Sequence, residues 1–269
     1  MTDREHDGKH RPLAGRRALV TGGGAGLGKL FSNALARAGA DLVICGRRSE
    51  VLEEAAKQMQ GLGGKVEPFP LDVSNPEDIK RAKVEIGAVD ILVNNAGYSI
   101  RRDSWLEITP DEWHEVIGVN LSGPFLMAQA FVPSMIERGW GRVVNLSSIY
   151  GVVASNPAHY PDMKSDNCSY SVAKHGLIGL TKHLAIRTAG TGVTVNVLSP
   201  GIFAAQSEKR RSDGTAAGAL TAQRLKEAIP VGRFGEDNDL SAIIVYLCGP
   251  DSGYVTGQNF SVDGGFTVW

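Results

Sequence analysis

The stretch Thr21-Gly-Gly-Gly-Ala-Gly-Leu-Gly28 joins a short β-branched run, residues 18–21, to an apolar pattern of helical spacing that stops at Gly39. Glycines allow a tight turn and the close approach of a ligand, and backbone N–H groups at the start of a helix attract a phosphate. A turn that binds nothing would use the same glycines, but the strand–turn–helix context favours a dinucleotide. We therefore assign to the cofactor Gly22, Gly26, Leu27 and Gly28.

Beyond this turn, short apolar or β-branched runs alternate with helical patterns to the end of the chain. The expected strands are residues 18–21, 42–45, 66–71, 89–93, 143–146, 193–197 and 258–262. Continuous apolar runs suit strands that are buried on both faces of a parallel sheet. The pattern predicts an α/β fold, a doubly wound parallel sheet with helices on both faces.

Length and composition indicate how this fold is organised. A chain of 269 residues is long enough for one large domain, and no Pro- or Ser-rich linker interrupts the alternation. We expect a single dinucleotide-binding catalytic domain, residues 13–269, after a disordered tail, residues 1–12. The irregular segment 203–222 is either a lid over the site or a solvated helix.

Charge and cysteine content exclude several classes of protein. The 28 basic and 29 acidic side chains give a formal charge of -1, and the basic clusters at 9–11 and 209–211 are too small for a nucleic-acid surface. Three cysteines without metal-ligand spacing argue against a disulfide framework and against any metal site. The N-terminus lacks an apolar signal region, and the longest uncharged stretch, residues 116–136, is interrupted by polar residues and prolines. We therefore expect a cytoplasmic protein that does not bind membranes.

The end of the second expected strand indicates which dinucleotide is bound. NAD enzymes usually place an acidic side chain there to hold the ribose 2′-hydroxyl, and this chain has Gly46 followed by Arg47 and Arg48. A guanidinium at this place pairs with the 2′-phosphate of NADP through charge-assisted hydrogen bonds. The alternative is that both arginines are solvated loop charges. We assign Arg47 and Arg48 to the cofactor and favour NADP(H) over NAD(H).

Four further groups follow in order along the chain: Asn94-Asn-Ala-Gly97, Asn120, Ser148 and Tyr170-Ser-Val-Ala-Lys174. Together with the glycine-rich turn they resemble the short-chain dehydrogenase/reductase family. The resemblance covers about residues 14–269, and includes Ser199-Pro-Gly201 and the closing segments 254–259 and 262–265. Each group alone is a weak signal, but the ordered set is specific.

The resemblance implies a Rossmann-like single domain with Tyr170 as general acid/base, Ser148 bound to the substrate oxygen and Lys174 bound to the nicotinamide ribose. Asn120 is implied to hold a water that links Lys174 to solvent. It further implies hydride transfer at the nicotinamide and a homotetramer, whose contacts would bury the apolar end of the chain, Phe266, Val268 and Trp269. Cofactor contacts are implied for Asp72, Val73, Asn94, Ala96, Gly97, Tyr170, Lys174, Pro200 and Gly201.

Elementary electrostatics supports the pairing of tyrosine and lysine. The ordinary tyrosine pKa is about 10, whereas proton exchange at neutral pH is best served by a value near 7. An ammonium about 4 Å away, at an effective dielectric constant near 20, supplies about 4 kcal/mol, or about three pKa units. Tyr170 and Lys174 are four residues apart and share one face of a helix. In the alternative interpretation, Tyr170 is a packed aromatic, Lys174 extends to solvent, and Ser148 and Asn120 only satisfy backbone groups.

Three features depart from the family pattern. Ser148 and Tyr170 are separated by an unusually long interval, which places an insertion, residues 156–169, beside the site. A threonine that usually contacts the nicotinamide carboxamide is replaced by Ala205, so that either a neighbour, Gln206 or Ser207, takes over or the contact is missing. The helix that starts at Pro76 is expected to be short.

The insertion also contains a second Tyr-x-x-x-Lys pattern, Tyr160 to Lys164. Tyr160 even lies closer to the family's usual distance from the serine. Pro157 and Pro161 interrupt a helix there, whereas the sequence after Tyr170 continues as a long apolar-periodic helix. We therefore predict that Tyr170 is the proton donor.

The substrate is less defined by the sequence. Polar residues of the insertion, with Tyr150, Arg101 and Arg102, would surround a sugar, polyol or hydroxy acid, unless the insertion is simply an exposed loop. Trp105, Trp113 and Phe203 would instead serve a lipophilic carbonyl. The sequence predicts an NADP(H)-dependent oxidoreductase that interconverts a secondary alcohol and a ketone of a small molecule, with a polar substrate favoured. The competing hypothesis is a non-catalytic nucleotide-binding regulator or scaffold on the same fold.

Overall fold

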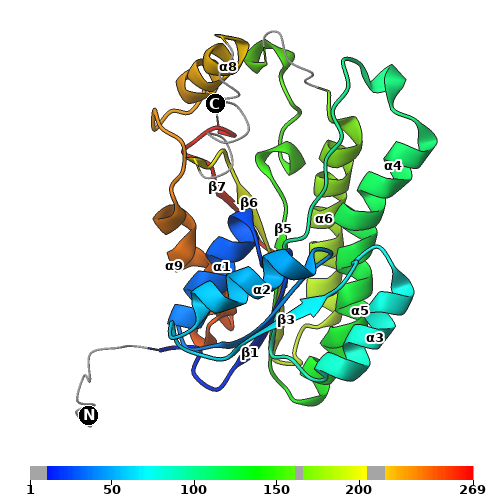
Figure 1. Ribbon diagram of the computed structural model, residues 1–269, viewed down its shortest axis with the longest axis vertical. Coiled ribbons are helices and arrows are strands. Elements are labelled where there is room, and N and C mark those ends of the chain that lie inside the picture. The colour runs from blue at the N-terminus through cyan, green and yellow to red at the C-terminus, as the bar shows by residue number, and fades with distance from the viewer. Residues whose placement is uncertain (1–10, 161–165, 205–215, 269) are drawn as a thin grey trace.

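The computed structural model describes residues 11–160, 166–204 and 216–268 (Figure 1). Most of the expected N-terminal tail, residues 1–10, therefore lies outside the described residues. The strands are β1 (Arg17–Thr21), β2 (Asp41–Gly46), β3 (Val66–Pro70), β4 (Ile91–Asn94), β5 (Gly141–Leu146), β6 (Val193–Pro200) and β7 (Asn259–Val262). The helices are α1 (Gly26–Arg37), α2 (Ser49–Met59), α3 (Pro76–Ile86), α4 (Pro110–Ile117), α5 (Gly123–Glu137), α6 (Cys168–Arg187), α8 (Ala216–Glu227) and α9 (Asp237–Cys248).

The strands form one parallel sheet in the order β3-β2-β1-β4-β5-β6-β7. This confirms the predicted doubly wound α/β fold. The strand order reverses between β1 and β4, and in such sheets the crevice at the carboxyl ends of the strands beside this point binds ligands.

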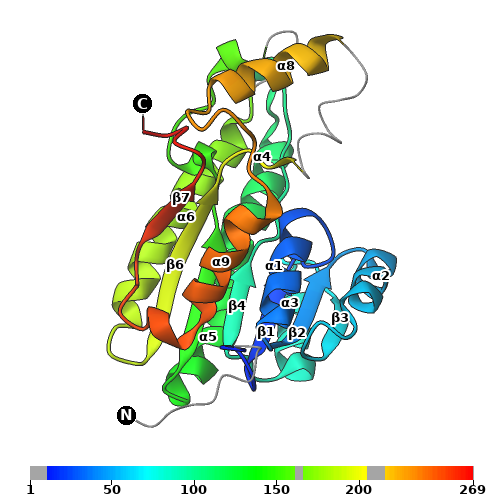
Figure 2. The same ribbon diagram turned by 90° about the vertical axis from the view of Figure 1, so that its left-hand side faces the viewer.

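The central strands are buried on both faces, as their continuous apolar runs predict. In β1, Ala18 and Val20 pack into the core on one side of the sheet, while Leu19, which points the opposite way, packs into the core on the other side. Helices α1, α2 and α9 cover the first face and α3, α5 and α6 the second (Figures 1 and 2). The edge strand β3 contains Pro68 and Pro70, which explains its less regular pattern.

Local signals set the helix ends. Helix α1 starts inside the glycine-rich turn and is followed by Gly39, whose φ of 99° suits a residue without a side chain. Helix α3 starts at Pro76 as predicted, because the Asn75 side chain accepts hydrogen bonds from the backbone N–H groups of Glu77 and Asp78. It has 11 residues, as many as α2, so it is not shorter than its neighbours.

Helices α4 and α5 are joined by a π-helical turn, Gly118–Ser122, into one continuous helix. Within the described residues this helix, Pro110–Glu137, is the one long and apolar enough to span a membrane by length and composition, with a mean hydropathy of 1.3. Its side chains Met127, Phe131 and Met135 are fully buried in the core beside the sheet. This burial is typical of a core helix.

Candidate active site

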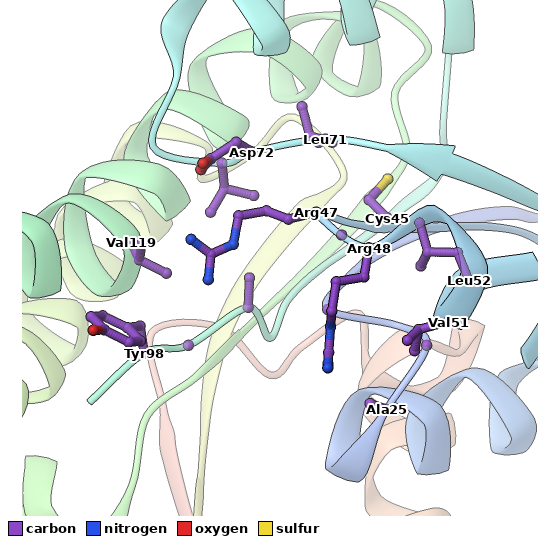
Figure 3. Close-up of a pocket in the computed structure, with 16 residues that line it drawn as sticks. Ala25, Cys45, Arg47, Arg48, Val51, Leu52, Leu71, Asp72, Tyr98 and Val119 are labelled. Atoms are coloured by element: carbon purple, nitrogen blue, oxygen red, sulfur yellow. The ribbon is translucent and has the colours of Figure 1, made fainter. Parts of the chain in front are cut away.

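A pocket lies at the carboxyl ends of the strands on both sides of the reversal point (Figure 3). It brings together seven of the cofactor residues predicted from the sequence: Gly22, Arg47, Arg48, Asp72, Val73, Ala96 and Gly97. It also contains lining residues that the sequence reasoning did not assign to the cofactor: Gly24, Ala25, Cys45, Gly46, Val51, Leu52, Leu71, Tyr98 and Val119. Most of the added residues are apolar and carry no motif, although the position of Leu71 directly after β3 was a usable signal.

The glycine-rich turn forms a cradle with room for backbone only. A Cβ atom on Gly28 would lie 2.0 Å from the carbonyl oxygen of Gly22, and Gly22 itself has a φ of 66°. No side chain caps the start of α1 at Ala25, which leaves the first N–H groups of the helix available to a phosphate. Gly26 opens the helix, while the side chain of Leu27 packs on the core. The turn therefore fits a dinucleotide pyrophosphate.

The turn is held in place by residues of the neighbouring strand. The Thr21 hydroxyl oxygen accepts hydrogen bonds of 3.0 Å from the backbone N–H groups of Asn95 and Ala96. The Asn95 side chain donates to the Thr21 carbonyl at 2.9 Å. These contacts join the ends of β1 and β4 at the reversal point, and Asn95 is a positioning residue that the sequence reasoning did not single out.

At the end of β2 there is free space beside Gly46, followed by two positively charged side chains, Arg47 and Arg48. A Cβ atom on Gly46 would meet one atom within 4 Å, the Leu52 Cδ2 at 3.7 Å. Arg47 and Arg48 are exposed, and within the described part of the chain no ion pair or hydrogen bond holds either guanidinium. Arg47 reaches across the pocket toward Val119, and Arg48 points toward Ala25 of the glycine-rich turn (Figure 3). Both side chains remain available to an anionic ligand.

The residues after β3 and β4 differ in their availability to a ligand. Asp72 lines the pocket and its Oδ1 accepts hydrogen bonds from the backbone N–H and hydroxyl of Ser74. Asn94 is 2% exposed, and its amide donates to Asn145 Oδ1 at 2.8 Å between the adjacent strands β4 and β5. This contact gives Asn94 a structural role within the sheet, and Asn94 is absent from the pocket lining.

Tyr170 and Lys174 lie one turn apart on α6. The Lys174 Nζ is 5.5 Å from the centre of the Tyr170 ring and donates to the Leu146 carbonyl, at the end of β5, at 2.7 Å. Behind them, a Cβ atom on Gly97 would lie 3.2 Å from Asn120 Oδ1 and 3.9 Å from Lys174 Nζ. Gly97, Asn120, the end of β5 and the Tyr170–Lys174 pair, which are far apart in the sequence, thus lie close together.

Lys174 is 3% exposed, and this burial lowers the pKa of its ammonium to about 7. The hydrogen bond to the Leu146 carbonyl fixes the position of the ammonium. The side chain does not extend to solvent, so this part of the alternative interpretation is wrong. A buried lysine with a lowered pKa is typical of a functional site.

Asn120 lies in the π-helical turn between α4 and α5 and is fully buried. Its amide nitrogen donates to the carbonyl oxygens of Tyr98 and Val116, at 2.6 and 2.9 Å. Asn120 therefore satisfies backbone groups at a helix irregularity, as the alternative interpretation expects. Its Oδ1 still lies beside Gly97 and Lys174, where π-turns commonly serve function.

Ser148 follows the end of β5 and is half-buried. Its hydroxyl oxygen accepts a hydrogen bond from the Tyr150 backbone N–H at 3.2 Å, so it caps a short 3₁₀ helix, Ile149–Gly151. The neighbouring Ser147 hydroxyl donates to the Lys174 carbonyl at 2.9 Å, which ties β5 to α6. Ser148 is thereby fixed next to the helix that carries Tyr170 and Lys174.

Pro200 and Gly201 lie at the carboxyl end of β6, where the Gly201 N–H donates to the Val262 carbonyl at 2.9 Å. A Cβ atom on Gly201 would lie 2.7 Å from the Asp263 Cα, so the position requires glycine. The residues expected to contact the carboxamide, 205–207, lie outside the described residues. The same holds for most of the segment 203–222 before α8.

The second tyrosine of the Tyr-x-x-x-Lys spacing has different surroundings. Tyr160 is 3% exposed, follows a short 3₁₀ helix, Pro157–His159, and its hydroxyl is hydrogen-bonded to the hydroxyl of Tyr150. Lys164 lies outside the described residues. Tyr160 thus directly follows a 3₁₀ helix, whereas Tyr170 lies in the first turn of α6.

The two substrate hypotheses involve different parts of the surface. Trp105 and Trp113 line an apolar groove together with Cys168, but Phe203 is 3% exposed and belongs to the core. The predicted lipophilic set is therefore not brought together. Arg101 packs over the ring of Tyr160, within the polar set.

Comparison with known proteins gives consistent matches over nearly the whole chain. The family model described as enoyl-(acyl carrier protein) reductase matches residues 22–267. The 3-oxoacyl-[acyl-carrier-protein] reductase FabG of Thermotoga maritima is 34% identical over 95% of this chain and 99% of the relative.

Solved structures give the same result. A gluconate 5-dehydrogenase of Burkholderia cenocepacia, in complex with NADP and tartrate, has a TM-score of 0.84 and 33% identity, and the match covers 97% of this chain and 98% of that one. A putative NAD(P)-dependent gluconate 5-dehydrogenase of Beutenbergia cavernae, with bound NADP, has a TM-score of 0.86 and 32% identity, over 97% of this chain and 100% of that one.

Proposed function

Since the chain belongs to the short-chain dehydrogenase/reductase family, whose named relatives are oxidoreductases, we propose that it interconverts a secondary alcohol and a ketone of a polar small molecule with NADP(H). The observation that carries the proposal is the meeting of Tyr170 and Lys174, on α6, with the end of β5 beside the dinucleotide pocket. A regulator or scaffold without turnover is not favoured, because the matched relatives named above are enzymes.

The candidate catalytic residues divide the chemistry between them. Ser148 orients the substrate oxygen through its hydroxyl, and Tyr170 gives a proton to that oxygen in reduction and removes it in oxidation. Lys174 binds the ribose hydroxyls of the cofactor, and its ammonium, 5.5 Å from the centre of the Tyr170 ring, favours the loss of the Tyr170 proton. Asn120 Oδ1, beside Lys174, holds a water for proton exchange with solvent. The nicotinamide, when bound, supplies or accepts the hydride.

The cofactor is placed by the glycine-rich turn and the ends of β2, β3 and β4. The pyrophosphate binds the open N–H groups at the start of α1, and Asp72 and Val73 border the adenine. The space at Gly46 and the two available guanidinium groups of Arg47 and Arg48 support a preference for NADP(H). The NADP found with two of the structural neighbours is consistent with this preference.

A polar substrate is supported by the residues near Ser148. Tyr150, Tyr160 and Arg101 lie beyond it, and Phe203, expected to serve a lipophilic carbonyl, is buried in the core. Gluconate, in the names of two neighbours, is such a molecule, whereas the FabG relative is named for an acyl thioester. We further propose that the protein is a cytoplasmic homotetramer, from its family and its exposed apolar end.

The direct test follows nicotinamide absorbance at 340 nm with NADP(H) and NAD(H) in parallel. The panel contains sugars, polyols, hydroxy acids, steroids and acyl thioesters. We expect turnover with a polar member of the panel and with NADP(H) in preference to NAD(H). Turnover confined to steroids or thioesters would contradict the polar substrate, and tight cofactor binding with no turnover on any member would favour the scaffold.

A further inference from the structure

Arg101 and Arg102, adjacent in the sequence after β4, have different partners. The Arg102 guanidinium forms an ion pair with Glu112, and its backbone is bonded in both directions to Asp166. Arg101 is half-buried, and its guanidinium carbon lies 5.1 Å from the centre of the Tyr160 ring. Within the described residues no carboxylate pairs with Arg101. One arginine is thus structural, and the other pairs with no carboxylate of the described residues.

Stacking on a ring leaves the binding edge of a guanidinium open. The N–H groups of arginine lie in the plane of the group, so contact of its face with an aromatic ring does not occupy them. The ring instead fixes the orientation of the group, which lowers the entropy lost when a ligand binds. The planar edge matches a carboxylate, with two parallel hydrogen bonds.

A continuous path of contacts connects Arg101 to the candidate catalytic residues. The Tyr160 ring lies under Arg101, the Tyr160 hydroxyl bonds the Tyr150 hydroxyl, and the Tyr150 backbone N–H donates to the Ser148 hydroxyl oxygen. Tyr170 packs against the same buried cluster that contains Tyr150 and Tyr160. Arg101 is thus linked to Ser148 through Tyr160 and Tyr150.

The backbone between Gly97 and Arg101 also connects Arg101 to the candidate catalytic residues. Arg101 is four residues after Gly97, which lies against both Asn120 and Lys174. Two acidic side chains on neighbouring segments are engaged elsewhere: Glu112 pairs with Arg102, and Asp166 Oδ1 accepts from the Cys168 backbone N–H at 3.1 Å. Neither of these carboxylates pairs with Arg101.

The tyrosine pair supports an anion at this place. Burial raises the pKa of the Tyr150 hydroxyl above its ordinary value, and the contact with Tyr160 raises it further. The Tyr150 hydroxyl therefore stays protonated and neutral at physiological pH. The Tyr150 hydroxyl therefore places no negative charge beside Arg101.

We propose that Arg101 binds a carboxylate of the substrate, so that the substrate is a hydroxy or oxo acid with a free carboxylate rather than a neutral polyol or an acyl thioester. This inference rests on the proposed function of the same site. Arg101 acts on specificity and takes no part in proton or hydride transfer.

The experiment measures binding to the protein saturated with NADP⁺, by isothermal titration calorimetry. The probes are gluconate, tartrate and 3-hydroxybutyrate, each matched with an uncharged counterpart: glucitol, threitol and 1,3-butanediol. We expect at least one acid to bind about 10- to 150-fold more tightly than its counterpart, the range for one charge-assisted contact. Arg101→Met, which keeps the apolar stem over the ring, should remove this difference, and Arg101→Lys should restore part of it.

Arg187→Met, an exposed arginine at the end of α6, is the matched control and should keep the difference. The inference is overturned if no acid binds better than its counterpart, or if Arg101→Met discriminates as well as the unaltered protein. An unchanged affinity of Arg101→Met for NADP⁺ shows that the variant is folded. Turnover with NADP⁺ tests the proposed function separately, and if NADP⁺ fails to bind, the acids titrated into the free protein still test Arg101.

Discussion

The hydroxyl of Tyr160 is hydrogen-bonded to the hydroxyl of Tyr150 inside a buried cluster. The Tyr170 ring, by contrast, lies 5.5 Å from the Lys174 ammonium on one helix. Both tyrosines precede a lysine by four residues in the sequence. Because their surroundings differ, we expect replacement by phenylalanine, which removes one hydroxyl, to have different effects at the two positions.

Tyr170→Phe should lower kcat by at least about 100-fold, the lower bound for loss of a positioned general acid, while the affinity for NADPH changes little. Tyr160→Phe should leave kcat within about fivefold and lower the free energy of unfolding by about 1–3 kcal/mol, since it takes a partner from the buried Tyr150 hydroxyl. Stopped-flow turnover, NADPH fluorescence titration and urea unfolding measure the three quantities. A Tyr160→Phe variant without turnover but with native stability would reverse the assignment.

Gly46→Asp should reduce or reverse the preference for NADPH over NADH. The added Cβ meets one atom, at 3.7 Å, so the fold accommodates it. The carboxylate repels the 2′-phosphate and accepts a hydrogen bond from a free 2′-hydroxyl. We expect the ratio of the two affinities to change by about 10- to 150-fold. Gly46→Ala is the matched control, since it adds the same Cβ without charge, and fluorescence titration of both cofactors is the measurement.

Arg47→Ala and Arg48→Ala separate the two guanidinium groups at this place. Arg47 reaches across the pocket, whereas Arg48 points to the glycine-rich turn (Figure 3). Loss of the arginine that binds the 2′-phosphate should weaken the affinity for NADPH about 10-fold or more and leave the affinity for NADH unchanged. If each variant lowered the affinities for NADPH and NADH by the same factor, neither arginine would bind this phosphate.

The fold was predictable because its signals are local. Short continuous apolar or β-branched runs predicted all seven strands, the glycine-rich turn and Gly39 predicted the ends of α1, and Pro76 predicted the start of α3. The fourth strand starts at Ile91 rather than Val89, and just before it the Asp90 side chain accepts a hydrogen bond from the Arg17 backbone N–H. Such a contact, between residues 73 positions apart, leaves no local pattern.

The site was predictable where a residue type is required by backbone geometry or by an ordered motif, as at Gly22, Gly97 and Lys174. It was not predictable where the role depends on a partner that the sequence does not indicate. The pairing of Asn94 with Asn145 and the pairing of Tyr150 with Tyr160 are of this kind. Both depend on which strands and loops become neighbours.

Association should involve two apolar surfaces. Ile186 is 76% exposed on α6, and Val268, near the end of the chain, is 82% exposed. A symmetric tetramer needs two kinds of contact, so loss of one should leave dimers. We expect tetramers for the unaltered protein, dimers for either Ile186→Glu or Val268→Asp, and monomers for the double variant, by sedimentation velocity at micromolar concentration. A monomeric unaltered protein would contradict the proposed assembly.

The last prediction concerns Lys174 and stability. Burial lowers its pKa from 10.5 to about 7 in the folded protein, so between these values the unfolded chain binds more protons at this residue. The free energy of unfolding therefore rises with pH through this window, and the cost of burying the charge is fully present below pH 7. Lys174→Met removes this cost. Without cofactor, the variant should be more stable than the unaltered protein at pH 6 by more than about 1 kcal/mol, and the difference should shrink toward pH 10.

Urea unfolding of both proteins at several values between pH 6 and pH 10 measures this difference. Lys182→Met, at an exposed position on the same helix, is the control and should follow the pH dependence of the unaltered protein. Parallel curves for Lys174→Met and the unaltered protein would mean that the ammonium is not destabilised by burial. The same variant should lose turnover and bind NADPH more weakly, because the charge that costs stability in the free protein is the one that Lys174 offers to the ribose and to Tyr170.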